Sequence, residues 1–138
     1  MELYHGTSNI SALAIIGPPP DVDVTKGGGE LGRGFYLGSE PSLAAALAKG
    51  NPRINPGLLK FTIDEAAYVK LNILIIKKRG YLAEKWHRLI RSRTTRTFLY
   101  HADVVVAPFA MIDVAHQYKF ESSAAETLLN TSDIKKIL

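Results

Sequence analysis

A tyrosine flanked by glycines is the first feature of this sequence that suggests chemistry. Tyr36 lies in the segment Gly34-Phe35-Tyr36-Leu37, whose aromatic and aliphatic content predicts a short strand. An aromatic ring beside glycines can lie flat against a planar ligand, because no neighbouring side chain covers that side of the backbone. The alternative is a core aromatic in an ordinary strand. His5 is the last residue of a strand that is predicted to begin at Glu2. The alternative to a functional role for His5 is an ordinary part-buried, hydrogen-bonded histidine.

The same region contains a pattern that resembles a dinucleotide fingerprint. Gly27, Gly29 and Gly32 satisfy G-x-G-x-x-G. That fingerprint requires a strand before it and a helix that begins within it. Here the glycines follow a proline-rich loop and lead into a strand, so we exclude a Rossmann site.

Other catalytic patterns are missing from the chain. It has no G-x-S-x-G nucleophile elbow and no P-loop. The spacing of His87, His101 and His116 suggests no metal site, and the chain has no cysteine. The sequence therefore predicts no bound metal and gives no support for Ser-His-Asp hydrolase chemistry.

Short helices and strands are predicted to hold the candidate residues. The predicted strands cover residues 2–5, 34–37, 58–63 and 117–121, and the segment 101–110 contains a buried strand at Val104-Val105-Val106. The predicted helices run from Ser8 or Asn9 to 16, then over 43–49, 81–91 and 124–130. We expect Ser39 to cap the second helix, with Pro41 in its first turn, and Ser122 or Ser123 to cap the last.

Two segments leave the secondary structure open. The apolar positions of residues 67–78 fit neither period, so we expect a strand at their beginning and an irregular or helical end. Residues 133–138 are either a last strand or a helical turn.

Residues 17–33 form a long glycine- and proline-rich loop, of a length that is usually functional or mobile. Without a repeat or linker, the pattern predicts one α+β domain over residues 1–138.

Composition limits the protein class. The chain has 138 residues and a formal net charge of +4, which permits an anionic partner such as RNA. No apolar run approaches the ~20 residues of a membrane span, and the start MELYHGTSNI lacks a signal peptide's features. A basic segment after the predicted third helix offers phosphate contacts, the alternative being a solvated helix face. Its arginines are Arg88, Arg91, Arg93 and Arg96, with Lys77, Lys78 and Arg79 before them.

Three segments, taken in order, resemble one enzyme superfamily. They are Leu3-Tyr4-His5-Gly6-Thr7-Ser8, Gly32-Arg33-Gly34-Phe35-Tyr36-Leu37 and Gln117-Tyr118-Lys119-Phe120-Glu121. Together they resemble the ADP-ribosyltransferase superfamily in its His-Tyr-Glu/Asp/Gln branch, which includes the poly-ADP-ribose polymerases and diphtheria toxin. Within this superfamily the chain resembles small bacterial ADP-ribosyltransferase-like domains, several of which are C-terminal toxins of polymorphic secretion effectors. The resemblance implies a split, mainly antiparallel β-sandwich with a few short helices around an NAD cleft.

The resemblance also implies a role for each residue of the first two segments. His5 would hydrogen-bond the ribose of NAD, the Gly6 backbone would hold the nicotinamide amide, and Thr7 would sit beside the ribose. Tyr36 would stack on the nicotinamide ring. Such contacts suit NAD, because an aromatic face attracts a planar pyridinium. Two neighbouring positions complete the implied cofactor site, namely Arg33, which replaces a lysine, and Gly34.

The third catalytic position departs from the common glutamate of the family. Gln117 cannot ionise and so cannot act as a general base, although it can orient a ribose hydroxyl or the nucleophile. Glu121 is the second candidate, since a residue four positions on along a strand lies on the same face. Each has a structural alternative as a surface strand residue.

The resemblance leaves three functions open. The first is a mono-ADP-ribosyltransferase that modifies a macromolecule, in which the nicotinamide–ribose bond is cleaved and a nucleophile attacks the ribosyl centre. The second is an NAD glycohydrolase, and the third is a non-catalytic binding module that retains the NAD cleft. The chain lacks the Glu-x-Glu signature of arginine-modifying members, which disfavours arginine as the acceptor. Tyr36 stands where the RNA phosphotransferase branch has a second histidine, which disfavours that chemistry.

The resemblance implies a secreted effector toxin domain that acts in the cytoplasm of a target cell in bacterial competition. Its expected partners are NAD, a macromolecular acceptor and an immunity protein, with no membrane. The basic segment favours structured RNA over protein as the acceptor.

Overall fold

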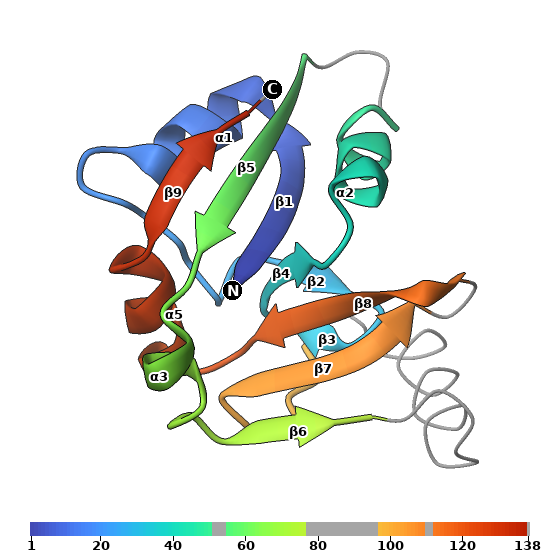
Figure 1. Cartoon of the computed structure of the whole chain (residues 1–138), viewed down its shortest axis with the longest axis vertical. Coiled ribbons are helices and arrows are strands. Elements are labelled where there is room, and N and C mark those ends of the chain that lie inside the picture. Colours follow the sequence, from blue (N-terminus) through green and yellow to red (C-terminus); the bar gives the residue numbers. More distant parts are fainter. Residues whose placement is uncertain (51–54, 77–96, 110–111, 138) are drawn as a thin grey trace.

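A computed structural model describes residues 1–50, 55–76, 97–109 and 112–137, which form an α+β fold (Figure 1). This confirms the predicted general α+β class. The strands are β1 (Glu2–Ser8), β2 (Gly28–Gly29), β3 (Gly32–Arg33), β4 (Phe35–Gly38), β5 (Pro56–Thr62), β6 (Ile73–Ile75), β7 (Val104–Phe109), β8 (Ile112–Phe120) and β9 (Asp133–Lys136). The described helices are α1 (Asn9–Ile16), α2 (Pro41–Ala48), α3 (Glu65–Tyr68) and α5 (Ser123–Asn130).

Hydrogen bonding joins seven strands into a single sheet in the order β6-β7-β8-β4-β1-β5-β9. Neighbouring strands are antiparallel except for β6 and β7. Strand β1 pairs with β5 over its whole length but meets β4 at one pair only, Tyr4 with Gly38. In Figure 1, β9, β5 and β1 run steeply, whereas β8, β7 and β6 lie almost horizontally. The sheet therefore separates into two halves between β1 and β4.

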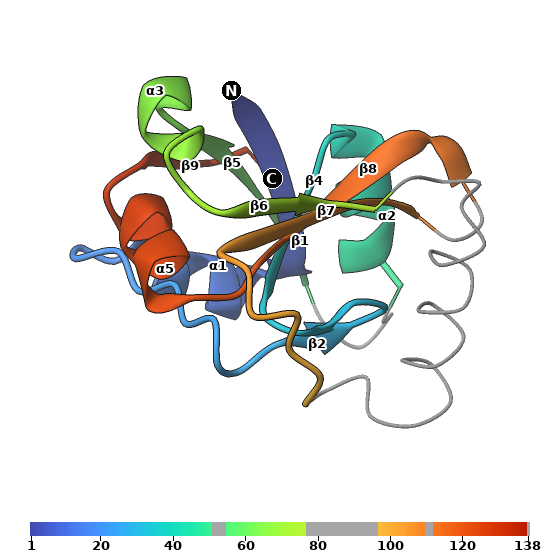
Figure 2. The ribbon, with the colours of Figure 1, turned by 90° about the horizontal axis from the view of Figure 1, so that it is seen from below.

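The two faces of the sheet contribute to different apolar clusters. Along β7, Val104 and Val106 belong to the main core, whereas Val105 and Ala107 belong to a smaller cluster with Leu31. This alternation follows from the two-residue period of a strand. Tyr36 packs against the smaller cluster. Helix α2 lies on one side of β1, and α1 and α5 lie on the other (Figures 1 and 2).

Two of the predicted helix caps are confirmed and one is wrong. Ser8 Oγ accepts from the Ser11 amide, and Ser122 Oγ accepts from the Ala125 amide, each at 3.1 Å. Helix α2 instead begins after Glu40, without a side-chain cap. Ser39 Oγ accepts a hydrogen bond from the backbone amide of His116 at 3.0 Å. A tertiary contact with β8 has replaced the local cap.

The structure corrects the expectation for the beginning of the segment 67–78, of which residues 77 and 78 lie outside the described residues. A helix comes first there, because the Asp64 carboxylate accepts from the Ala66 amide and caps α3. The strand β6 comes later and is held by its parallel pairing with β7. Strand β8 starts earlier than predicted and ends at Phe120, before Glu121. The predicted loop contains the small β2–β3 hairpin, and the tail includes the strand β9. The helix predicted over 81–91 lies outside the described residues.

In the described part of the chain, no helix combines the length and the apolar character needed to cross a membrane.

Candidate functional site

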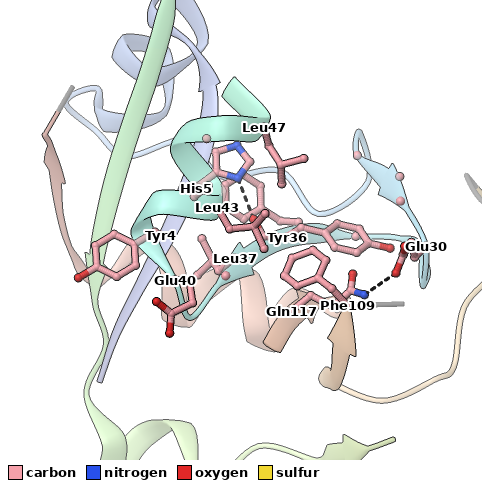
Figure 3. Close-up of a pocket in the computed structure, with 18 residues that line it drawn as sticks. Tyr4, His5, Glu30, Tyr36, Leu37, Glu40, Leu43, Leu47, Phe109 and Gln117 are labelled. Carbon is pink, nitrogen blue, oxygen red and sulfur yellow. Dashed lines mark hydrogen bonds between the residues drawn. The ribbon is translucent and has the colours of Figure 1, made fainter. Parts of the chain in front are cut away.

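A pocket of about 440 Å³ lies where β1 and β4 separate (Figure 3). This volume is within the range of small-molecule sites. The pocket is lined by β1 and β4, by the β2–β3 hairpin and the residue before it, by α2 with the residue before it, and by single residues from β7 and β8. Its chemistry comes mainly from four side chains, which are His5, Glu30, Tyr36 and Gln117.

His5 bridges the gap between the two halves of the sheet. Its ring stacks on Phe35, with the ring centres 4.3 Å apart, and its Nδ1 lies 2.7 Å from the backbone oxygen of Tyr36. Burial lowers the pKa of His5, so the ring is neutral at neutral pH. Because a carbonyl oxygen only accepts hydrogen bonds, Nδ1 carries the proton. Nε2 is then the ring atom that can accept a hydrogen bond.

The Tyr36 ring anchors the β2–β3 hairpin. Its hydroxyl accepts from the Leu31 amide at 3.0 Å and donates to the carbonyl of Gly32. Burial also raises the pKa of Tyr36 well above its usual value. A β-carbon built at Gly29 would lie only 3.0 Å from Cζ of the ring, so the hairpin passes this close because the position is glycine. The ring is held in one orientation between the hairpin and the pocket.

Gln117 brings an unpredicted acid into the pocket. The Gln117 side chain is almost completely buried, with 2% exposed. Its Nε2 donates to Glu30 Oε2 at 2.8 Å and to the carbonyl of Pro108 at 3.4 Å. Figure 3 shows this pair beside the hydroxyl end of the Tyr36 ring, with His5 at its other end. Sequence reasoning missed Glu30, and its place in a glycine-rich turn before Tyr36 is the only signal for it.

The pocket brings together most, but not all, of the predicted site residues. His5, Gly6, Gly34, Tyr36 and Gln117 line it. Gly6 lies so close to α2 that an added β-carbon would be 1.9 Å from the carbonyl oxygen of Ala44, so glycine is required there. The nucleic-acid candidates Arg88, Arg91, Arg93 and Arg96 lie outside the described residues.

Three other predicted residues do not line the pocket, namely Thr7, Arg33 and Glu121. Glu121 follows the end of β8, and its carboxylate forms an ion pair with the buried Lys119. The same carboxylate accepts from the backbone amides of Tyr100 and His101, at 3.1 and 2.7 Å. These contacts give Glu121 a structural role at the end of the strand, and burial lowers the pKa of Lys119.

The charged residues that the structure describes in the pocket lining are both acidic. Among the described residues that line the pocket, Glu30 and Glu40 are charged, and none is lysine or arginine. Carboxylates and aromatic rings both interact favourably with a cation or a cationic ring. Within the described ranges, no group of three or more histidine, cysteine or acidic residues could hold a metal ion.

Comparison of the chain with protein-family models gives no match, and comparison with curated proteins also gives no match.

Proposed function

We propose that this protein is an NAD-dependent mono-ADP-ribosyltransferase whose NAD site is the pocket between β1 and β4. The supporting observation is that His5 and Tyr36, which lie 31 positions apart in the chain, meet through a 2.7 Å hydrogen bond in one pocket. The separation of the sheet at this point also supports the ADP-ribosyltransferase type of fold, in which NAD lies between two halves of a β-structure.

The groups around the pocket suit the nicotinamide end of NAD. The Nε2 atom of neutral His5 would accept a hydrogen bond from a ribose hydroxyl, and the Gly6 backbone would bind the carboxamide. The Tyr36 ring would contact the pyridinium, whose positive charge matches the acidic lining. Fixed contacts of this kind orient the scissile bond before reaction.

The acceptor is proposed to be a macromolecule. Structured RNA is preferred because the sequence contains a basic segment with Arg88, Arg91, Arg93 and Arg96. The role as a toxin and the immunity protein as a partner rest on the resemblance of the sequence.

The test uses NAD labelled in its ADP-ribose part, a cell lysate and purified protein, with nuclease and protease treatment of the labelled product. We expect label on a macromolecule and release of nicotinamide. Free ADP-ribose as the only product would instead indicate a glycohydrolase. Failure to bind or consume NAD would refute the proposal.

One variant of His5, with a control variant elsewhere, connects this activity to the pocket. The amide nitrogen of Asn can reproduce the Nδ1 bond to the Tyr36 carbonyl but provides nothing at the Nε2 position. We therefore expect His5→Asn to fold normally and to lose at least about 100-fold in NAD turnover. Glu65→Gln is the control, because the Glu65 side chain is 75% exposed on α3 and does not line the pocket. Wild-type turnover by His5→Asn would remove His5 from the site.

A further inference from the structure

The third catalytic position, Gln117, lacks the negative charge that the proposed reaction needs. When the bond between C1′ of the ribose and the nicotinamide nitrogen breaks, its electron pair moves to the pyridinium nitrogen and C1′ becomes cationic. A fixed negative charge stabilises such a centre, and a carboxylate can also remove the proton of the attacking group. Gln117 can do neither, because its amide does not ionise.

The structure provides a carboxylate beside this amide. We infer that Glu30 is the acidic catalytic residue of the pocket and that Gln117 is a positioning residue that acts through it, an inference that rests on the proposed function. The geometry that carries it is the 2.8 Å hydrogen bond between Gln117 Nε2 and Glu30 Oε2. Both residues line the pocket that contains His5 and Tyr36.

Several contacts restrict where the Glu30 carboxylate can lie. The Gln117 amide is buried and donates to a second acceptor, the carbonyl of Pro108, so its nitrogen faces the pair of acceptors. The residues after Glu30 are fixed to the hydroxyl of Tyr36 through the Leu31 amide and the Gly32 carbonyl. The carboxylate is therefore anchored both through its side chain and through the neighbouring backbone. This is the double support that a precise site requires.

The step that follows is balanced without another reagent. An N–H or O–H group of the acceptor attacks cationic C1′, and a new bond forms between that atom and C1′. The proton of the attacking group passes to a Glu30 carboxylate oxygen and then to solvent. The products are neutral nicotinamide, the ADP-ribosylated acceptor and one proton. With water as the acceptor, the same step gives ADP-ribose.

Single variants of Glu30 test the charge. Glu30→Gln preserves the size of the side chain and an oxygen that accepts from Gln117, but it removes the charge. We expect kcat to fall about 100-fold or more while KM for NAD changes less than about threefold. Glu30→Asp restores a carboxylate one methylene further away, so its kcat should lie between the two. Glu65→Gln and thermal melting serve as controls for surface charge and folding.

A double-mutant cycle separates positioning from a purely structural role. Gln117→Leu should lower kcat, and combining it with Glu30→Gln should add almost no further loss, because the amide acts through the carboxylate. If Gln117→Leu does not fold, Gln117→Asn, which keeps an amide but shortens it, takes its place in the cycle. Losses that add in the double variant would show that Gln117 does not act through Glu30.

The possible failures can be told apart. If the wild type turns over NAD and Glu30→Gln remains within about twofold of it, the assignment of Glu30 is overturned and the proposed function stands. If the wild type neither transfers ADP-ribose nor hydrolyses NAD, both the proposed function and this inference are overturned.

Discussion

Removing one oxygen atom from Tyr36 should loosen the hairpin that carries Glu30. The Tyr36→Phe variant retains the ring and its contact with Gly29. It leaves the Leu31 amide and the Gly32 carbonyl without the hydroxyl that now joins them. The perturbation is therefore confined to two hydrogen bonds, and the packing of the ring is unchanged.

The cost follows from these two bonds. A net contribution of about 1 kcal/mol for each gives a loss of about 2 kcal/mol in the free energy of unfolding. Complete burial would raise the cost, but the ring also lines the pocket, where water can reach part of the site. For a chain of this length, 2 kcal/mol corresponds to a fall of roughly 6 to 8 °C in Tm.

The assay compares Tyr36→Phe with Tyr4→Phe in urea and thermal unfolding. The Tyr4 hydroxyl makes an exposed 3.4 Å contact with Glu2, so its removal should cost less than about 0.5 kcal/mol. Amide exchange adds a local measurement, because the Leu31 amide should exchange faster in Tyr36→Phe only. Equal stability of the two variants, with unchanged exchange at Leu31, would refute the anchoring role of the hydroxyl.

Two further predictions concern β1. Gly6→Ala should destabilise the protein by about 3 kcal/mol, because the new β-carbon would be 1.9 Å from the Ala44 carbonyl oxygen. The control Gly38→Ala should change stability by less than about 1 kcal/mol, because the atoms nearest to its new β-carbon are 4.0 Å away. Denaturant unfolding measures both costs, and equal costs would contradict the close packing of α2 on β1. Since burial lowers the pKa of His5, its neutral form contributes stability that is complete above the unfolded pKa of about 6.5 and is lost as pH falls through the lower folded pKa. The stability of the wild type relative to His5→Asn should therefore decrease as the pH falls below about 6.5, and a constant difference would show that His5 is not buried in its neutral form.

Local patterns predicted the elements whose stabilising contacts are themselves local. The caps at Ser8 and Ser122 join atoms only three residues apart, so the local residue types are enough to predict them. The strand around Tyr36 was likewise predicted from its aromatic and aliphatic residues. The pattern failed at Ser39, because a hydrogen bond to a residue 77 positions away competes with a cap of about 1 kcal/mol.

The position of β6 could not be predicted for a similar reason. Its residues fit neither period well, and its pairing partner is β7, about 30 residues further along the chain. Strand preference depends strongly on neighbouring strands, so a three-residue segment such as Ile73–Ile75 becomes a strand only when its partner is present.

The sequence predicted some features of the candidate site, and the tertiary structure decided the others. By itself, the sequence predicted that a histidine and a tyrosine lie in two separate strand segments, and it proposed Gln117 for the third position. The predicted end of the first strand at His5 was wrong, because pairing with β5 continues β1 to Ser8. Only the tertiary structure decided that Gln117 meets Glu30, 87 positions away, while Glu121 turns to Lys119 at the end of β8. The physical reason is that side-chain types specify which bonds are available, whereas the folded backbone specifies which partners lie within about 3 Å of one another.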